Sequence, residues 1–234
     1  KLDALVLTGA NPASPELTTE PFWGGMVDVI EWGRDNVCST LCSCLATHAV
    51  VKRYHQVERI KLPQKRWGVY SHCILDRTHF LTRHLNLRFD APHSHVYEVT
   101  QKQLESAGLT VLAVSEQAGV HLAVSADQFQ FVYFQGHPEY DFNSLFKEFK
   151  REVTRFANAV RDEYPPFPEN YFDDKTITIL DNYRDKLLGA NDKTQVLEEF
   201  PEQDIERLLD NTWTDTGKGM FNNWLARVLQ FSVA

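Results

Sequence analysis

Residues 37–51 of the chain read VCSTLCSCLATHAVV. An apolar, cysteine-rich run ends at Ser43, and a segment with the composition of a helix follows from Leu45 to Val51. This pattern predicts a buried strand, a sharp turn and a helix, with Cys44 at the turn. A cysteine in that place gains thiolate character from the N-terminus of the following helix. Cys44 is therefore predicted to be a nucleophile.

A second motif supplies a base for that nucleophile. The sequence GHPEYD, residues 136–141, comes just after the apolar run FQFVYF, residues 129–134. His137 and the carboxylate of Glu139 thus stand together at a strand end, where the carboxylate can orient the imidazole. Sites of open α/β sheets gather at the carboxyl ends of strands. The two motifs together favour a cysteine-nucleophile enzyme.

The periodicity of the chain predicts an α/β fold with a mixed, mostly parallel sheet flanked by helices. With 234 residues, 43% hydrophobic and 24% charged, the simplest division is one domain over residues 1–234. A proline-rich segment, residues 164–172, should form an extended connector. The predicted strands are 4–7, 37–43, 67–70, 95–99, 110–114, 120–124 and 130–134, and the predicted helices are 22–32, 45–51, 143–163 and 219–229.

Charge and cysteine usage narrow the class of protein. A formal charge of −8 and a pI near 5.6 argue against nucleic acid as a partner. No apolar run has the length of a membrane span, so we expect no membrane partner and a cytoplasmic location. The four cysteines do not form a secreted disulfide framework, and their spacing predicts no metal site; they are Cys38, Cys42, Cys44 and Cys73.

Several further motifs, in order along nearly the whole chain, resemble the homoserine O-acyltransferase family, also called homoserine O-succinyltransferases or transsuccinylases. The resemblance implies a class I glutamine amidotransferase-like, flavodoxin-like fold with a nucleophile elbow at Cys44. Family members carry a further N-terminal segment, so we expect that the full-length protein has one that this chain lacks. Beyond the two motifs above, the resemblance rests on LTGA (7–10), FW (22–23), EW (31–32), Lys65 with GVY (68–70), PHS (92–94), AGV (118–120) and NNWL (222–225).

The resemblance also implies roles for single residues. Cys44 would hold the acyl group as a thioester, with His137 as general base and Glu139 as its orienting partner. A position in the loop after the LTGA motif, here Ala13, would help select the acyl donor. The substrate contacts would be Lys65, Ser94 and Arg151, and the oxyanion donors would come from the loop at Gly9 and Ala10 and from the backbone N–H of Leu45.

Departures from the family pattern gather near the nucleophile. The family usually has CWGAQA where this chain has CLATHA, residues 44–49, so Ala46 replaces a glycine and His48 a glutamine. A Cβ resists backbone angles that glycine tolerates, so we expect a differently shaped elbow. His95 stands where an arginine commonly follows the PHS motif, which predicts a weaker or pH-dependent positive contact.

The resemblance implies an acyl-CoA-dependent O-acyltransferase, specifically an L-homoserine O-succinyltransferase of methionine biosynthesis that works by a ping-pong course. The small, uncharged Ala13 favours succinyl-CoA over acetyl-CoA as co-substrate, since it would not repel a succinyl carboxylate. No bound cofactor is expected, and the partners are small molecules, with a homodimer left open. The alternatives are a homoserine or serine O-acetyltransferase, an amidotransferase-like hydrolase and a non-catalytic binding protein.

Overall fold

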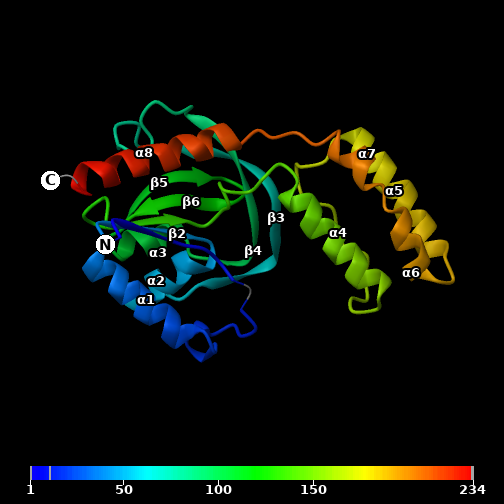
Figure 1. The fold of residues 1–234 in the computed structure, drawn as a ribbon, viewed down its shortest axis with the longest axis horizontal. Coiled ribbons are helices and arrows are strands. Elements are labelled where there is room, and N and C mark those ends of the chain that lie inside the picture. The colour runs from blue at the N-terminus through cyan, green and yellow to red at the C-terminus, as the bar shows by residue number, and fades with distance from the viewer. Residues whose placement is uncertain (1, 11, 233–234) are drawn as a thin grey trace.

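One seven-stranded sheet runs through the part of the chain that the computed structural model describes, residues 2–10 and 12–232 (Figure 1). Its strand order is β1-β2-β7-β6-β5-β3-β4. The strands are β1 Ala4–Leu7, β2 Ser39–Ser43, β3 Ile60–Ile74, β4 Arg88–Glu98, β5 Thr110–Ser115, β6 Gly119–Val124 and β7 Phe131–Phe134.

The mixed α/β class is confirmed, with one correction to the pairing. Strands β1, β2 and β7 pair in parallel. The neighbours β7–β6, β6–β5, β5–β3 and β3–β4 are all antiparallel, so the described sheet has two parallel pairings and four antiparallel ones. The sheet was expected to be mostly parallel, and this part of the prediction is wrong. Parallel neighbours need a long crossover connection, and a loop as short as that between β5 and β6 allows only an antiparallel hairpin.

Helices cover both faces of the sheet and extend beyond one end of it (Figure 1). On one face lie α1 (Trp23–Asn36), α2 (Leu45–His55) and α3 (Gln101–Ser106), and on the other lies α8 (Thr214–Ser232). A separate group, drawn at the right of the figure, is formed by α4 (Ser144–Ala157), α5 (Asp174–Gly189), α6 (Lys193–Val196) and α7 (Glu202–Glu206). The short 3-10 helices are η1 (Leu17–Thr19) and η2 (Leu197–Glu199).

The helix predicted over residues 143–163 ends earlier, at Ala157. The apolar spacing continues to Val160, but Ala159 has a φ of 55°, and the backbone N–H of Val160 donates back to the carbonyl of Arg155 at 2.9 Å. A left-handed residue followed by such a backward bond is a common helix ending. The helices α5 to α7 were not predicted.

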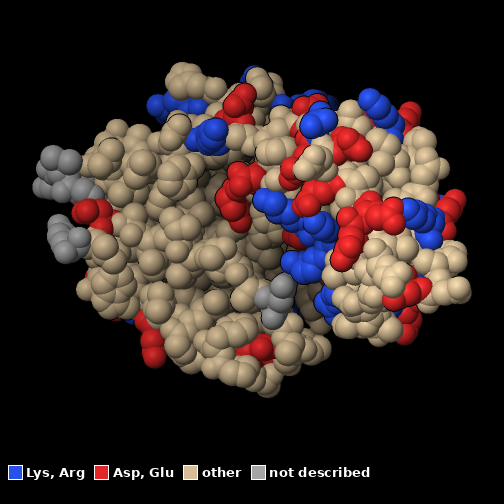
Figure 2. Space-filling model, turned by 45° about the vertical axis from the view of Figure 1, so that its right-hand side comes forward, with Lys and Arg blue, Asp and Glu red and all other residues tan. Residues whose placement is uncertain are grey.

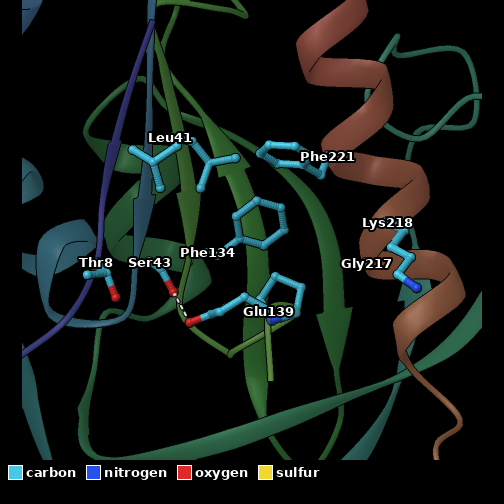
Figure 3. A pocket seen from close by; sticks show the side chains of 10 residues that line it. Thr8, Leu41, Ser43, Phe134, Glu139, Gly217, Lys218 and Phe221 are labelled. Atoms are coloured by element: carbon cyan, nitrogen blue, oxygen red, sulfur yellow. Dashed lines mark hydrogen bonds between the residues drawn. The ribbon is translucent and has the colours of Figure 1, made fainter. Parts of the chain in front are cut away.

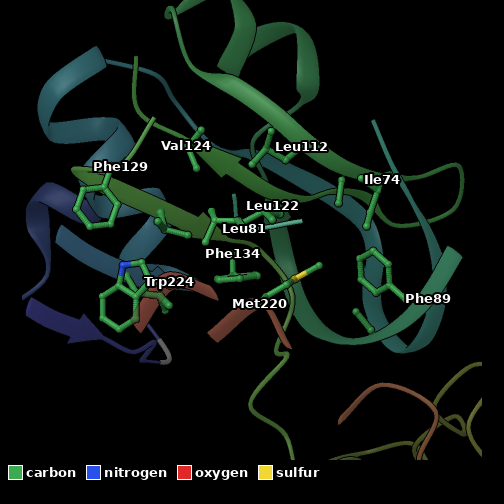
Figure 4. Close-up of a cluster of buried hydrophobic side chains, with 14 of the residues drawn as sticks. Ile74, Leu81, Phe89, Leu112, Leu122, Val124, Phe129, Phe134, Met220 and Trp224 are labelled. Atoms are coloured by element: carbon green, nitrogen blue, oxygen red, sulfur yellow. The ribbon is translucent and has the colours of Figure 1, made fainter. Parts of the chain in front are cut away.

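Two hydrophobic cores lie on the two faces of the sheet, because successive side chains of a strand point to opposite sides. Along β7, Phe131 and Tyr133 join the core under α1 to α3. Phe134 packs instead against Met220 and Trp224 of α8, as Figure 4 shows. A strand with both faces buried must be apolar throughout, and this explains the run FVYF.

A third core joins the helical group to the sheet. Phe146, Phe149 and Leu180 of α4 and α5 are fully buried against Trp67 and Val69 of β3. The predicted extended connector, residues 164–172, crosses β3 at this point and pairs with it at Gly68.

Two backbone hydrogen bonds join the connector to β3. The N–H of Val69 donates to the carbonyl of Glu169 at 2.9 Å, and the N–H of Glu169 donates to the carbonyl of Trp67 at 2.8 Å. A Cβ at Gly68 would lie only 2.2 Å from the Glu169 oxygen. The close approach of the two backbones therefore requires glycine.

Within the described residues, no helix is long and apolar enough to cross a membrane.

Candidate active site

The strand, turn and helix predicted within residues 37–51 form as expected. Strand β2 ends at Ser43 and α2 begins at Leu45, so Cys44 makes the whole turn. Its φ of 52° and ψ of −115° are rare for a residue with a Cβ. The N–H of Cys44 donates to the carbonyl of Phe134 at 2.8 Å, which ties the turn to the neighbouring strand β7. Such a constrained angle, held by its surroundings, is typical of a functional position.

His137 and Glu139 lie in the loop that leaves β7. The backbone N–H of His137 donates to the carbonyl of Pro92 at 2.8 Å, and its ring nitrogen Nδ1 donates to Oε1 of Glu139 at 2.8 Å. The Ser43 hydroxyl donates to the same carboxylate oxygen at 3.0 Å. The imidazole also stacks on the ring of Tyr140, with centroids 4.2 Å apart. These contacts fix the ring, and with it the direction of Nε2.

Electrostatics couple His137 to the nucleophile. Burial acts to lower the pKa of His137, but the hydrogen bond with Cys44 and the bond and charge of Glu139 outweigh it and raise the pKa to about 10. Burial acts to raise the pKa of Glu139, and the hydrogen bond and charge of His137 lower it instead. His137 is therefore an imidazolium at neutral pH. A charged imidazolium beside the Cys44 sulfur places a proton donor next to the predicted nucleophile.

A polar cavity of about 310 Å³ opens above Cys44. It lies between the sheet and the helical group, and Figure 2 shows a hollow in this part of the surface with charged side chains at its rim. The structure brings most of the predicted site residues together on the cavity wall: Gly9, Ala10, Cys44, Lys65, Ser94, His137, Glu139 and Arg151.

At one corner of the cavity, the loop after β1 comes close to Cys44 and to the start of α2. A Cβ placed on Gly9 would lie 3.2 Å from the Cβ of Cys44 and 3.4 Å from the backbone nitrogen of Leu45. Leu45 is the first residue of α2, and the first N–H groups of a helix have no partner within the helix. Gly9 thus lets the loop after β1 approach the nucleophile and leaves space beside that N–H.

Glu148 is a site residue that the sequence analysis missed. Its carboxylate accepts hydrogen bonds from the Lys65 ammonium at 3.3 Å, from the Ser94 hydroxyl at 2.6 Å and from the Tyr140 hydroxyl at 2.6 Å. Burial acts to raise the pKa of Glu148, and these partners lower it. One feature of the sequence could have indicated Glu148: it precedes Arg151 by three residues, so the two side chains share one face of a helix.

Lys65 and Arg151, two positively charged side chains of the cavity wall, differ in their ion-pair contacts. The Lys65 side chain is 35% exposed and lies beside Glu148, and its Nζ is 4.4 Å from the ring centre of Trp67. Burial lowers the pKa of Lys65 against the raising effect of Glu148. The Arg151 side chain is 58% exposed, and its Nε lies 3.7 Å from Glu152. Arg151 is therefore free to turn toward an anionic ligand.

Ala46, His48 and His95, which depart from the family pattern, are all buried close to Cys44. Ala46 is buried and is not among the residues with positive φ, so the elbow is formed without a glycine there. His48 is also buried, and its Nε2 lies 3.0 Å from the side-chain oxygen of Gln135. Burial lowers the pKa of His95 to about 3. A neutral His95 would give no positive contact, so the weaker contact at this position stays a prediction.

Ala13 lies in the loop after β1 but outside the residues that line the described cavity, and it is exposed. Its role in choosing the acyl donor stays a prediction.

A second, apolar cavity of about 240 Å³ has the hydrogen-bonded side chains of Ser43 and Glu139 in its wall (Figure 3). Leu41, Phe134 and Phe221 line it, so it reaches from the sheet to α8. Near its start, helix α8 also contacts the loop that carries His137 and Glu139. A Cβ on Gly217 would lie 2.6 Å from the carbonyl oxygen of Pro138, and the indole N–H of Trp213 donates to the carbonyl of Tyr140 at 2.7 Å.

Comparison with solved structures identifies the fold. A glutamine amidotransferase from Thermotoga maritima superposes with a TM-score of 0.52 at 15% identity, covering 97% of this chain and 77% of that one. A glutamine amido transferase from Methylobacillus flagellatus gives a TM-score of 0.51 at 11% identity, covering 96% and 94%. These likenesses show the fold alone, and it is of the class I glutamine amidotransferase-like class.

Within that class, the chain belongs to the homoserine O-succinyltransferase family, whose sequence model matches residues 1–232. The relative from Methylobacter tundripaludum, a homoserine O-succinyltransferase, is 54% identical over 231 residues, which are 99% of this chain and 65% of the relative. The homoserine O-succinyltransferase of Nitrosococcus oceani is 53% identical over 99% of this chain and 64% of its own length. The chain thus spans about 65% of the length of these relatives.

Proposed function

We propose that the protein is an acyl-CoA-dependent L-homoserine O-succinyltransferase that acts in methionine biosynthesis. The observation that carries the proposal is the Cys44–His137–Glu139 arrangement at the floor of a cavity that also presents Lys65 and Arg151. The family supplies the substrate class, since its curated relatives bear that name. The substrates are small molecules, no resident cofactor is required, and we assign the enzyme to the cytoplasm.

In the first half-reaction, the Cys44 thiolate attacks the carbonyl carbon of the succinyl thioester. The negative charge that develops on the carbonyl oxygen is met by backbone N–H groups, with that of Leu45 beside Gly9 the best placed. The bond between the carbonyl carbon and the sulfur of CoA then breaks. CoA leaves as a thiol with the proton of the His137 imidazolium, and the succinyl group stays on Cys44 as a thioester.

In the second half-reaction, His137 is neutral and accepts the hydroxyl proton of homoserine as the hydroxyl oxygen attacks the acyl carbon. The carbon–sulfur bond to Cys44 breaks, which restores the thiolate, and the imidazolium is restored with it. Glu139 stabilises that imidazolium through the 2.8 Å hydrogen bond to Nδ1. Each half-reaction therefore ends in the charge state that the next one needs.

The cations of the cavity suit the carboxylates of the two substrates. Lys65 is held in place by Glu148, which also holds the Ser94 hydroxyl. Arg151 has the planar donor set that binds a carboxylate through two hydrogen bonds. Positive charge at two points of one wall fits the carboxylate of homoserine and the distal carboxylate of a succinyl group.

The test uses the full-length protein. Incubation with succinyl-CoA alone should release CoA and add one succinyl mass to the intact chain, and added homoserine should remove that mass. Cys44→Ala should take up none, while the matched variant Cys73→Ala should be acylated normally. An adduct that persists in Cys44→Ala would overturn the assignment. Ammonia release from glutamine without CoA turnover would identify an amidotransferase-like hydrolase instead.

A further inference from the structure

Three buried histidines from three strands meet directly behind the catalytic loop. They are His72 of β3, His93 of β4 and His121 of β6, and none has any exposed surface. One ring nitrogen from each lies within 4.8 Å of the other two. The proposed acyl transfer uses none of these side chains, so their convergence needs another explanation.

The hydrogen bonds of these rings determine which nitrogen carries a proton. Nδ1 of His72 lies 2.8 Å from the carbonyl oxygen of Tyr70. A carbonyl oxygen only accepts hydrogen bonds, so this Nδ1 must be the donor. Burial disfavours the charged form, and a neutral ring has one N–H. The Nε2 of His72 therefore carries a lone pair.

The same reasoning applies to His93 through its neighbour. Nδ1 of His95 donates to the carbonyl oxygen of Tyr97 at 2.7 Å, so the Nε2 of neutral His95 is an acceptor. That acceptor lies 3.0 Å from Nδ1 of His93, which must carry the proton. The Nε2 of His93 is left with a lone pair as well.

Two lone pairs thus face each other inside the protein. The Nε2 atoms of His72 and His93 are 3.1 Å apart, with no proton between them when both rings are neutral. Beside them, neither ring nitrogen of His121 has a hydrogen-bond partner among the described residues. Buried polar groups are nearly always satisfied, so an unpaired cluster of acceptors points to a missing positive centre.

We propose that His72, His93 and His121 bind a Zn²⁺ ion. Zinc–nitrogen bonds of about 2.0–2.1 Å at a tetrahedral angle place two ligating nitrogens about 3.4 Å apart, close to the observed 3.1 Å. The Nδ1–H bond of His72 to a backbone carbonyl is the arrangement that orients metal-binding histidines. A water molecule completes the tetrahedron.

Gly136 leaves the space that the ion needs. A Cβ at this residue would lie 2.7 Å from Nε2 of His93 and 2.7 Å from Nδ1 of His121. Any other residue would place carbon between the ligands. Gly136 immediately precedes the catalytic His137, whose N–H is bonded to the carbonyl of Pro92, the residue before His93. The ion would therefore fix three strands to each other and to the loop that carries the base.

The experiment is elemental analysis of the full-length protein, purified without added chelator. We expect about one equivalent of zinc per chain. His121→Phe keeps a ring of similar size in the same aromatic surroundings and should lower the zinc content at least tenfold. The matched control is His84→Asn, because His84 is exposed with a φ of 63° that asparagine tolerates.

A second measurement does not depend on the variant folding. The wild type is unfolded, stripped of metal and refolded with Zn²⁺, with Co²⁺ or with chelator present. Refolding with Co²⁺ should give the visible absorption of a four-coordinate site, and Zn²⁺ should raise the melting temperature above that with chelator. If the wild type contains less than a tenth of an equivalent of any transition metal, and refolds equally well with chelator, the histidines share a proton and the proposal is overturned. Both readouts are independent of acyl transfer.

Discussion

Gly68→Ala tests whether the connector, residues 164–172, joins the helical group to the sheet. The added Cβ would lie 2.2 Å from the oxygen and 2.6 Å from the nitrogen of Glu169, so the two backbones must separate. Separation breaks the hydrogen bonds of 2.9 and 2.8 Å between the connector and β3. Each bond contributes about 0.5–1.5 kcal/mol net, and forced repacking costs about 1–3 kcal/mol more.

The loss should therefore be about 3 kcal/mol in the free energy of unfolding. In a domain of this size that lowers the melting temperature by about 6–12 °C. The measurement is urea denaturation of both proteins, followed by fluorescence and extrapolated to zero denaturant. The KM for homoserine should also rise, because α4 carries Glu148 and Arg151 to the cavity.

The matched control is Gly24→Ala in α1, where an added Cβ would meet nothing within 4 Å. Alanine is the better helix former, so this variant should be unchanged or about 1 kcal/mol more stable. A loss of less than about 1 kcal/mol in Gly68→Ala would refute the reasoning, since the backbones would then part without cost.

Four further outcomes are expected. Gly9→Ala should lower kcat about 10²–10³-fold with little change in melting temperature, because its Cβ crowds the oxyanion corner; an unchanged kcat would place the oxyanion elsewhere. His137→Ala should lower turnover by about 10²–10⁴-fold, and Glu139→Gln by less, in steady-state assays of CoA release. The folded pKa of His137 is raised to about 10, so its contribution to stability is complete below about pH 6.5 and is lost as pH rises to about 10. Denaturation of wild type and His137→Gln should therefore differ less at pH 10 than at pH 6. Ala13→Glu should shift kcat/KM from succinyl-CoA toward acetyl-CoA, and an unchanged ratio would remove Ala13 from donor selection.

The sequence was sufficient for those parts of the fold that depend on local pattern. The apolar run before Cys44 and the helical composition after it predict the elbow, because strand, turn and helix are all specified within 15 residues, 37–51. The run before His137 predicts the strand that carries the base in the same way. Sheet order and pairing were not predictable to that degree, since they depend on contacts between distant strands.

The residues that were missed have partners far away in the sequence. Glu148 is separated by 54 positions from Ser94 and by 83 from Lys65, so its spacing on α4 alone made it resemble a solvated helix face. His72 and His121 lie on separate strands, and nothing in the sequence of one strand indicates which rings from other strands lie opposite. The topology of the sheet is what brings them together.

The contact between α8 and the catalytic loop has a consequence for biosynthesis of the chain. Gly217 of α8 lies against Pro138, and Trp213 just before the helix binds the carbonyl of Tyr140. During translation, Cys44 and His137 leave the ribosome well before these residues do. Until α8 has been made and has docked, the loop between Pro138 and Tyr140 lacks one of its supports. The loop that carries His137 and Glu139 therefore gains this support only after α8 has left the ribosome and docked.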